Sequence, residues 1–186
     1  MKYIRDEEFI RGDCPMTKEE IRILSISKME LREDSKVLDV GAGTGSVTVQ
    51  AAKICHKGSV IGIEKDPAAL ETIYKNIEKF QANNLKVLEG TAMEHMKDMK
   101  EEFDSIFIGG SSGELRDIID EAYRMLKDSG VMVLNFITLN NVYTAMEKLK
   151  ELKCKVECIQ VGISKTRGQS YMLTALNPIF IVRAEK

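Results

Sequence analysis

Short apolar runs rich in β-branched residues recur along the chain and alternate with segments of helical periodicity. The runs cover residues 36–40, 59–63, 85–88, 103–108 and 130–136. Continuous rather than alternating hydrophobicity is typical of parallel strands that are covered by helices on both faces. The pattern therefore predicts a parallel sheet built from successive strand–helix units.

The segments between these runs carry apolar stripes at helical spacing. Asp66 and Pro67 suit the cap and the first turn of a helix that follows the second strand. Further helices are predicted over 112–127 and 139–152. The three stripes consist of Leu70, Ile73, Tyr74, Ile77 and Phe80, then Leu115, Ile118, Ile119, Ala122 and Leu126, then Val142, Ala145, Met146, Leu149 and Leu152.

The two ends of the chain depart from this alternation. Residues 1–30 form an amino-terminal extension, in which Thr17 and Glu20 fit a capping box and Ile21, Leu24 and Met29 make an inward helical face. Residues 154–186 contain two strand-like runs with no helical stripe between them. We therefore predict one α/β domain over 1–186, a three-layer sandwich. Its core spans 31–153, and its mostly parallel seven-stranded sheet has an antiparallel carboxyl-terminal strand.

Composition narrows the class of protein. The chain of 186 residues is 44% hydrophobic and 30% charged with a net charge of −2, which does not indicate a nucleic-acid binder. Its apolar runs are too short to cross a bilayer, and its acidic start lacks a signal-peptide core, so we expect a cytoplasmic protein. The four cysteines are interpreted as buried free thiols, although Cys154 and Cys158 are spaced closely enough for half of a redox or metal site.

Three alternate glycines follow the first predicted strand, in "KVLDVGAGTGSV". A dinucleotide fingerprint reads G-x-G-x-x-G, whereas Gly41, Gly43 and Gly45 are followed by serine. Asp39 precedes them, and an acid at this place disfavours a pyrophosphate but favours a ligand with a cationic amino group. S-adenosylmethionine is such a ligand, and Glu64 at the end of the second strand suits its ribose hydroxyls.

"VLDVGAGTG" followed by "VIGIEKD" resembles the first two motifs of class I S-adenosylmethionine-dependent methyltransferases, which have a Rossmann-like fold. In that superfamily the third strand ends in a turn that contacts adenine, often through an aspartate. Here Thr91 and Ala92 stand at that turn, so their backbone groups, or Glu94 as a substitute, would hold the adenine. The predicted cofactor-binding residues are Thr17, Asp39, Gly41, Ala42, Gly43, Thr44, Gly45, Glu64, Thr91 and Ala92.

The fourth predicted strand ends in "IFIGGSSG", which contains no obvious general base. We expect Gly109, Gly110 and Ser111 to lie beside the reacting methyl group, because a turn poor in side chains leaves room for a bulky acceptor. Gly110→Val would then spare cofactor binding and block transfer. An acceptor that is already nucleophilic needs mainly alignment at roughly 3–3.5 Å.

Several segments in order, above all "FIRGDCPMTKEE" and "IFIGGSSG", resemble the family of decarboxylating cobalt-precorrin-6B carbon-15 methyltransferases of cobalamin biosynthesis, over essentially the whole chain. The resemblance implies methylation of a meso carbon of a polycarboxylate tetrapyrrole, with loss of carbon dioxide from an acetate arm. It also implies a homotetramer. Longer relatives fuse a second methyltransferase domain that acts on carbon 5, so that enzyme would be a separate partner here. No metal site is expected.

A substrate rich in carboxylates requires cationic side chains. The candidates outside the core are Arg5, Arg11, Lys18, Lys165 and Arg167, of which we favour Arg11 and Arg167. His56 and His95 are weak candidates for a catalytic base. Three alternatives stay open, namely an RNA methyltransferase, a methyltransferase for another small molecule, and a non-catalytic protein that binds S-adenosylmethionine. The interruption of the closing hairpin by residues 164–177 is too long for a tight turn and favours pairing between subunits.

Overall fold

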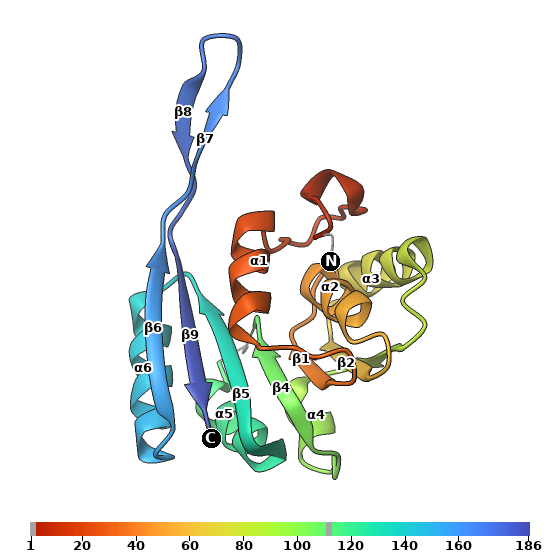
Figure 1. The fold of residues 1–186 in the computed structure, drawn as a ribbon, viewed down its shortest axis with the longest axis vertical. Helices are drawn as coiled ribbons and strands as arrows, with labels where there is room; N and C mark the ends of the chain where they lie inside the picture. The colour runs from red at the N-terminus through yellow and green to blue at the C-terminus, as the bar shows by residue number, and fades with distance from the viewer. Residues whose placement is uncertain (1–2, 111–112) are drawn as a thin grey trace.

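The computed structural model describes residues 3–110 and 113–186, which fold around a seven-stranded sheet of order β3-β2-β1-β4-β5-β9-β6 (Figure 1). The elements in chain order are η1 (Asp6–Glu8), α1 (Glu19–Lys28), β1 (Lys36–Val40), α2 (Ser46–Ile54), β2 (Ser59–Glu64), α3 (Pro67–Phe80), β3 (Leu85–Glu89), α4 (Ala92–Met96), β4 (Phe103–Ile108), α5 (Leu115–Met125), β5 (Leu126–Phe136), α6 (Leu139–Glu151), β6 (Lys155–Val161), β7 (Ser164–Arg167), β8 (Met172–Ala175) and β9 (Ile179–Glu185).

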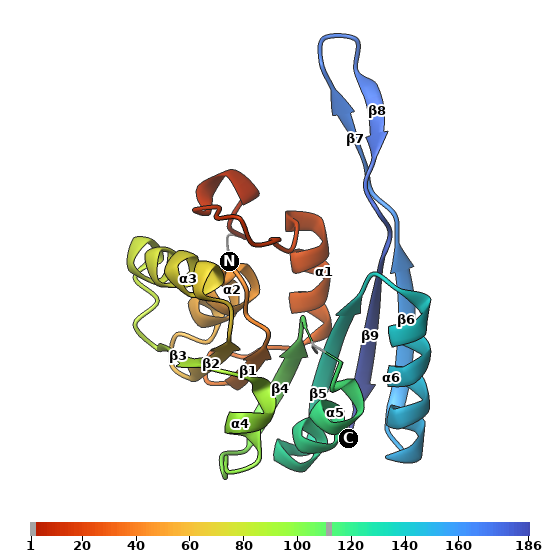
Figure 2. The same cartoon turned by 180° about the vertical axis from the view of Figure 1, so that it is seen from behind.

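Strands β1 to β5 are mutually parallel, and β9 pairs antiparallel with both β5 and β6. Helices α1, α2 and α3 cover one face of the sheet, while α4, α5 and α6 cover the other (Figure 2). The predicted three-layer sandwich with a mostly parallel seven-stranded sheet is therefore confirmed. In the described part of the chain, no helix is long and apolar enough to span a bilayer.

The predicted burial of the helical stripes is confirmed for their central residues and wrong for two others. Ile73, Ile118, Ile119, Ala145 and Leu149 are fully buried. Two members of the stripes instead face solvent: Tyr74 is 44% exposed and donates its hydroxyl to Glu89, and Met146 is 39% exposed. The predicted helix over 112–127 ends at Met125, because Leu126 already pairs with Phe103 as the first residue of β5.

The predicted capping box at Thr17 and Glu20 is wrong. Helix α1 begins at Glu19, and Lys18 is its N-cap without a side-chain capping bond. The Glu20 carboxylate instead forms an ion pair with Lys165, with 2.6 Å between Nζ and Oε1. Burial raises the pKa of Glu20, but the contact with Lys165 lowers it, and the net shift is downward. Leu24 is 36% exposed, so the inward face of α1 runs through Ile21, Ile26 and Met29 instead.

The interruption of the closing hairpin is a two-stranded arm. In the described part of the chain, strands β7 and β8 pair with each other and with no other strand, and every residue in them is exposed. The arm leaves the body between the end of β6 and the start of β9, and Figure 1 shows it projecting beyond the sheet. Because Phe180 of β9 lies opposite Phe136 of β5, the base of the arm sits at the edge where the parallel strands end.

The cysteines are free, and their burial is less uniform than we predicted. Cys55 is buried, whereas Cys14, Cys154 and Cys158 are half-buried. Among the described residues, no group of three or more His, Cys, Asp or Glu side chains could hold a metal ion.

Candidate functional site

The turns after β1 and β4 meet at the carboxyl edge of the sheet. The Gly109 amide donates to the carbonyl of Val40 at 2.9 Å, and the amides of Gly41 and Ala42 both donate to Ile63 at 3.0 Å. A Cβ on Gly41 would lie 2.8 Å from the amide nitrogen of Gly110, and Gly41 has a φ of +77°. Glycine is therefore required at Gly41 both by its backbone angle and by the close approach of the second turn.

This crossing gives a testable difference between two glycines. We expect Gly41→Ala to reduce the free energy of unfolding by roughly 2–4 kcal/mol, since it combines left-handed strain with overpacking. Gly110→Ala serves as the control, because among the described residues the nearest atom to its Cβ would be the Cα of Gly41, at 3.9 Å. Urea unfolding measures both, and equal stability of Gly41→Ala and the wild type would contradict this account of the turn.

Two adjoining cavities open at this edge and share Pro15, Gly41, Gly43 and Gly109. The smaller, of about 270 Å³, is further lined by the ends of β2 and β3 and their turns, with Ile63, Glu64, Thr91 and Ala92. The larger, of about 470 Å³, lies between the start of α1, the end of β5 and the base of the arm. Its mostly apolar wall includes Phe107, Phe136, Ile163 and Leu176, with Lys18 and Asn177 as polar members.

The Glu64 carboxylate lines the smaller cavity and is fixed by backbone hydrogen bonds, one of them to the glycine turn that both cavities share. One carboxylate oxygen accepts from the Gly43 amide at 2.7 Å, and the other accepts from the amides of Lys65 and Asp66 at 2.8 Å each. These backbone bonds fix the carboxylate where the second strand ends. The side chain is available as an acceptor for ligand hydroxyls in the smaller cavity.

Asp39 lines the larger cavity and is buried. Burial raises the pKa of its carboxyl to about 7, against a 2.5 Å hydrogen bond from the Thr48 hydroxyl that favours the charged form. Its Oδ1 and the hydroxyl of Thr44 have no hydrogen-bond partner among the described residues. Unpartnered buried oxygens beside a cavity fit a ligand with a cationic amino group.

The structure brings most of the predicted cofactor residues together. Thr17, Asp39, Ala42 and Thr44 line the larger cavity, Glu64, Thr91 and Ala92 line the smaller one, and Gly41 and Gly43 line both. Gly45 lines neither: it is the left-handed N-cap of α2, and a Cβ there would lie 2.5 Å from Ile73. Gly45 therefore serves the packing of α2 against α3.

The adenine turn differs from expectation at Glu94. Thr91 and Glu94 form a capping box for α4, in which the Glu94 carboxylate accepts from the Thr91 amide at 2.7 Å. That bond lowers the pKa of Glu94. Glu94 lines neither cavity, whereas Thr91 and Ala92 both line the smaller one, so Glu94 is a poor substitute for the missing aspartate. The backbone of Thr91 and Ala92 remains the candidate adenine contact.

The predicted acceptor residues separate in space. Gly109 lines both cavities, but Gly110 lines only the smaller one, with Glu64 and Ala92. A larger side chain at Gly110 would thus intrude on the cofactor side, contrary to our expectation for Gly110→Val. Ser111 lies outside the described residues.

The cationic and histidine candidates also differ in their placement. Only Lys18 among the five cations lines the larger cavity. Arg11 lies 3.9 Å from Asp6, and Arg167 ends β7 on the exposed arm. His56 and His95 bond the backbone carbonyls of Ile54 and Glu89, and neither lines the two cavities.

Sequence reasoning missed several residues of the larger cavity. Asn135 on β5 exchanges hydrogen bonds with the Ser25 hydroxyl of α1, and Asn177 belongs to the segment after the arm. Pro15 and Met16 belong to the "FIRGDCPMTKEE" segment, whose family resemblance does not by itself indicate that these two side chains line a cavity.

Comparison with known proteins agrees with this geometry. Residues 8–186 match the family model described as a precorrin methyltransferase domain. A Sulfolobus acidocaldarius protein named "Probable cobalt-precorrin-6B C(15)-methyltransferase (decarboxylating)" is 43% identical over 98% of this chain and 97% of its own length. The "Cobalt-precorrin-6B C(15)-methyltransferase (decarboxylating)" of Salmonella typhimurium is 36% identical over 98% of this chain and 96% of its own.

A solved structure extends the likeness to the fold. The crystal structure of precorrin-6y C5,15-methyltransferase from Geobacter metallireducens superposes with a TM-score of 0.93 at 37% identity, over 98% of this chain and 97% of that one. The expected Rossmann-like methyltransferase fold is thereby confirmed. The chain belongs to the precorrin methyltransferase family.

Proposed function

We propose that this protein is an S-adenosylmethionine-dependent methyltransferase that acts on carbon 15 of cobalt-precorrin-6B, or of its cobalt-free form, and decarboxylates an acetate side chain, in cobalamin biosynthesis. The observation that carries the proposal is the pair of cavities that meet at Gly41, Gly43 and Gly109. The smaller cavity holds the ribose and adenine residues Glu64, Thr91 and Ala92, and the donor's amino group extends to Asp39 in the larger cavity. The apolar remainder of the larger cavity gives space for an acceptor. The names of the full-length relatives support the same acceptor.

The residues on the donor side take distinct roles. Glu64 accepts the ribose hydroxyls, the Thr91–Ala92 backbone meets the adenine, and Asp39 faces the cationic amino group. S-adenosylmethionine, when bound, supplies an electrophilic methyl group on its sulfonium. The glycine turn keeps side chains away from the junction through which that methyl group must reach the acceptor.

The larger cavity suits a flat, conjugated acceptor. Its wall is mostly apolar, and Lys18 and Asn177 provide polar contacts for side-chain carboxylates. The bond between the acetate carbon and its carboxylate breaks, carbon dioxide leaves, and the electron pair enters the conjugated ring. The ring therefore needs no protein base to become nucleophilic, which agrees with a cavity that neither His56 nor His95 lines. Arg11 and Arg167 stay predicted contacts for outer carboxylates.

The alternative functions predict different experimental results. An RNA methyltransferase would shift labelled RNA in a gel at physiological salt, and a non-catalytic protein would bind S-adenosylmethionine without transferring its methyl group. We expect no RNA shift, and transfer of a labelled methyl group to the corrinoid. Tighter binding of NAD than of S-adenosylmethionine would overturn the assignment to the methyltransferases.

The proposal includes a single methyltransferase domain over residues 1–186, a cytoplasmic location, and a separate carbon-5 methyltransferase as a pathway partner.

A homotetramer is also part of the proposal. The arm carries Tyr171, Met172 and Leu173 at 76%, 62% and 69% exposure, and such apolar surface favours burial against other copies of the chain. We expect light scattering at micromolar protein to give the tetramer mass. Replacing the three arm residues by serine should reduce that mass, whereas Tyr74→Ser on the exposed face of α3 should not. A wild-type monomer would contradict this assembly.

A further inference from the structure

An amino-terminal strap, defined as residues 4–18, forms one wall of both cavities. Cys14 and Pro15 line the smaller cavity, and the larger one is lined by Pro15, Met16, Thr17 and Lys18. The remaining walls come from strand ends, turns, the start of α1 and the arm base. The shape of the donor site therefore depends on where the strap is held.

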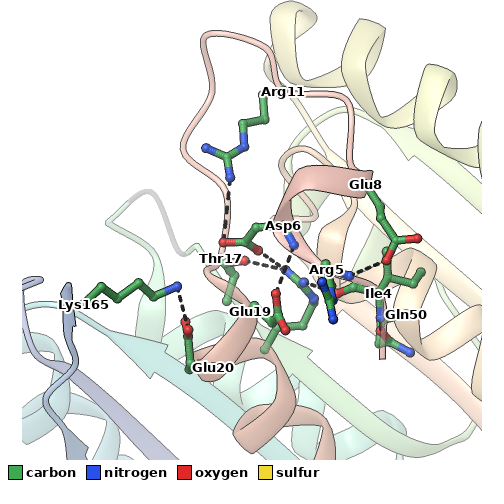
Figure 3. Close-up of polar contacts among 11 residues, drawn as sticks. Ile4, Arg5, Asp6, Glu8, Arg11, Thr17, Glu19, Glu20, Gln50 and Lys165 are labelled. Carbon is green, nitrogen blue, oxygen red and sulfur yellow. Dashed lines mark hydrogen bonds and ion pairs between the residues drawn. The ribbon is translucent and has the colours of Figure 1, made fainter. Parts of the chain in front are cut away.

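Three buried polar side chains from three successive helices hold the strap. Arg22 of α1 donates to the carbonyls of Ile4 at 2.6 Å and Thr17 at 2.8 Å, and to the Asp6 carboxylate at 3.1 Å. Its guanidinium also lies 4.8 Å from the centre of the Phe9 ring. Figure 3 shows Asp6 and Thr17 converging at this point from opposite ends of the strap.

The other two buried side chains, Gln50 and Asn76, bond the strap at Ile4 and Ile10. Gln50 of α2 accepts from the Ile4 amide at 2.8 Å (Figure 3). Asn76 of α3 accepts from the Ile10 amide at 2.8 Å and donates to the Ile10 carbonyl at 3.0 Å. Arg22, Gln50 and Asn76 are all fully buried. A buried guanidinium is costly without partners, and the side-chain hydrogen bonds that Arg22 donates within residues 3–110 and 113–186 all end on the strap. Arg22 can therefore be buried at low cost only when the strap is docked against it.

Asn76 also reaches the donor-binding turn. The same amide group that bonds Ile10 donates to the carbonyl of Thr44 at 2.9 Å, inside the glycine turn. One side chain thus ties the strap to the turn that lines both cavities. Sites joined through a shared element influence each other reciprocally, so a ligand that tightens the turn also tightens the strap.

We propose that Arg22 and Asn76 are positioning residues for the methyl donor, which act through Thr17 and Thr44 without contacting the donor themselves. This inference rests on the proposed function, because it assumes that the donor occupies the cavities described above. It adds that the strap and the glycine turn form one coupled unit, which donor binding makes more rigid.

The test uses S-adenosylhomocysteine, the demethylated donor, and the full chain. We expect Asn76→Ala to raise the Kd for this ligand by about tenfold in calorimetry, as the loss of buried hydrogen bonds implies. Asn84→Ala is the matched control: the Asn84 amide likewise bridges two carbonyls, but those of Ala52 and Cys55 belong neither to the strap nor to the glycine turn. At a similar loss of thermal stability, this control should leave the Kd unchanged.

Two further measurements separate positioning from general stability. Arg22→Gln combined with Asn76→Ala should raise the Kd by less than the product of the single effects, because both act through one strap. In the wild type, S-adenosylhomocysteine should slow hydrogen exchange of the strap amides, and this readout holds even where Asn76→Ala fails to fold. Equal Kd values for Asn76→Ala and Asn84→Ala, or unchanged exchange in the wild type, would overturn the inference. Failure of the wild type to bind the ligand would instead overturn the proposed function.

Discussion

Glu64→Ala is expected to weaken binding of S-adenosylhomocysteine by at least about tenfold in calorimetry. Hydrogen bonds from hydroxyls to a charged acceptor contribute ~1.5–3 kcal/mol, and the substitution removes the carboxylate that would accept both ribose hydroxyls. In the ligand-free structure that carboxylate already accepts three backbone amides, from Gly43, Lys65 and Asp66. A carboxylate has about four acceptor positions, so we expect the Gly43 bond to give way when both hydroxyls bind. Because ligand binding breaks the Gly43 bond, part of the gain from the ribose hydrogen bonds is lost. The loss of affinity in Glu64→Ala should therefore be nearer tenfold than a thousandfold.

Glu89→Ala is the matched control for this variant. Glu89 ends β3 and lies opposite Glu64 in the strand register, but its carboxylate bonds the exposed Tyr74 hydroxyl and lines neither cavity. Its removal should leave ligand affinity unchanged. Undiminished affinity in a folded Glu64→Ala protein would show that the ribose lies elsewhere.

Asp39 is expected to make donor binding depend on pH. Its raised pKa of about 7 means that the carboxyl is largely neutral at acidic pH and becomes a carboxylate as the pH rises through that value. A cationic amino group prefers the carboxylate. We therefore expect affinity for S-adenosylmethionine to rise about tenfold between about pH 5.5 and about pH 7.5, and then to level off.

The stability of the ligand-free protein should change in the opposite direction. The folded state holds the Asp39 proton more tightly than the unfolded chain, where an aspartic acid titrates near 4. The free energy of unfolding therefore falls as the pH rises from about 4 to about 7, and this fall ends above the folded pKa. Asp39→Asn removes this titration, so both its stability and its donor affinity should lose this pH dependence. Parallel pH profiles of the variant and the wild type would contradict the role of Asp39.

The sequence allowed prediction of the features that depend on local pattern. The parallel strands, the glycine turn after β1 and the acid at the end of β2 are encoded within a few neighbouring residues, and the structure places them as expected. The expected burial is wrong for β3, which lies at the edge of the sheet and has no buried residue. Asp39 and Glu64 were predicted to bind the same ligand, and this is consistent with parallel strands that end at one edge of the sheet.

Features set by distant partners could not be predicted in the same way. Thr17 and Glu20 have the spacing of a capping box, but Arg22 holds the Thr17 carbonyl and Lys165 pairs with Glu20, so the helix starts later. The side of the sheet edge on which Gly110 lies depends on its contact with Gly41, a turn far away in the sequence. The partners of Arg22 and Asn76 are mainly backbone carbonyls, which residue identities do not reveal.

The most direct test of the proposed function is anaerobic incubation of the protein with cobalt-precorrin-6B and S-adenosylmethionine carrying a labelled methyl group, followed by mass analysis of the corrinoid. We predict a product that has gained one labelled methyl group in place of a hydrogen atom and lost one molecule of carbon dioxide, with the methyl group on carbon 15. A corrinoid of unchanged mass, with protein that binds S-adenosylhomocysteine normally, would contradict the assigned acceptor. A methylated product that retains every carboxylate would contradict the decarboxylation.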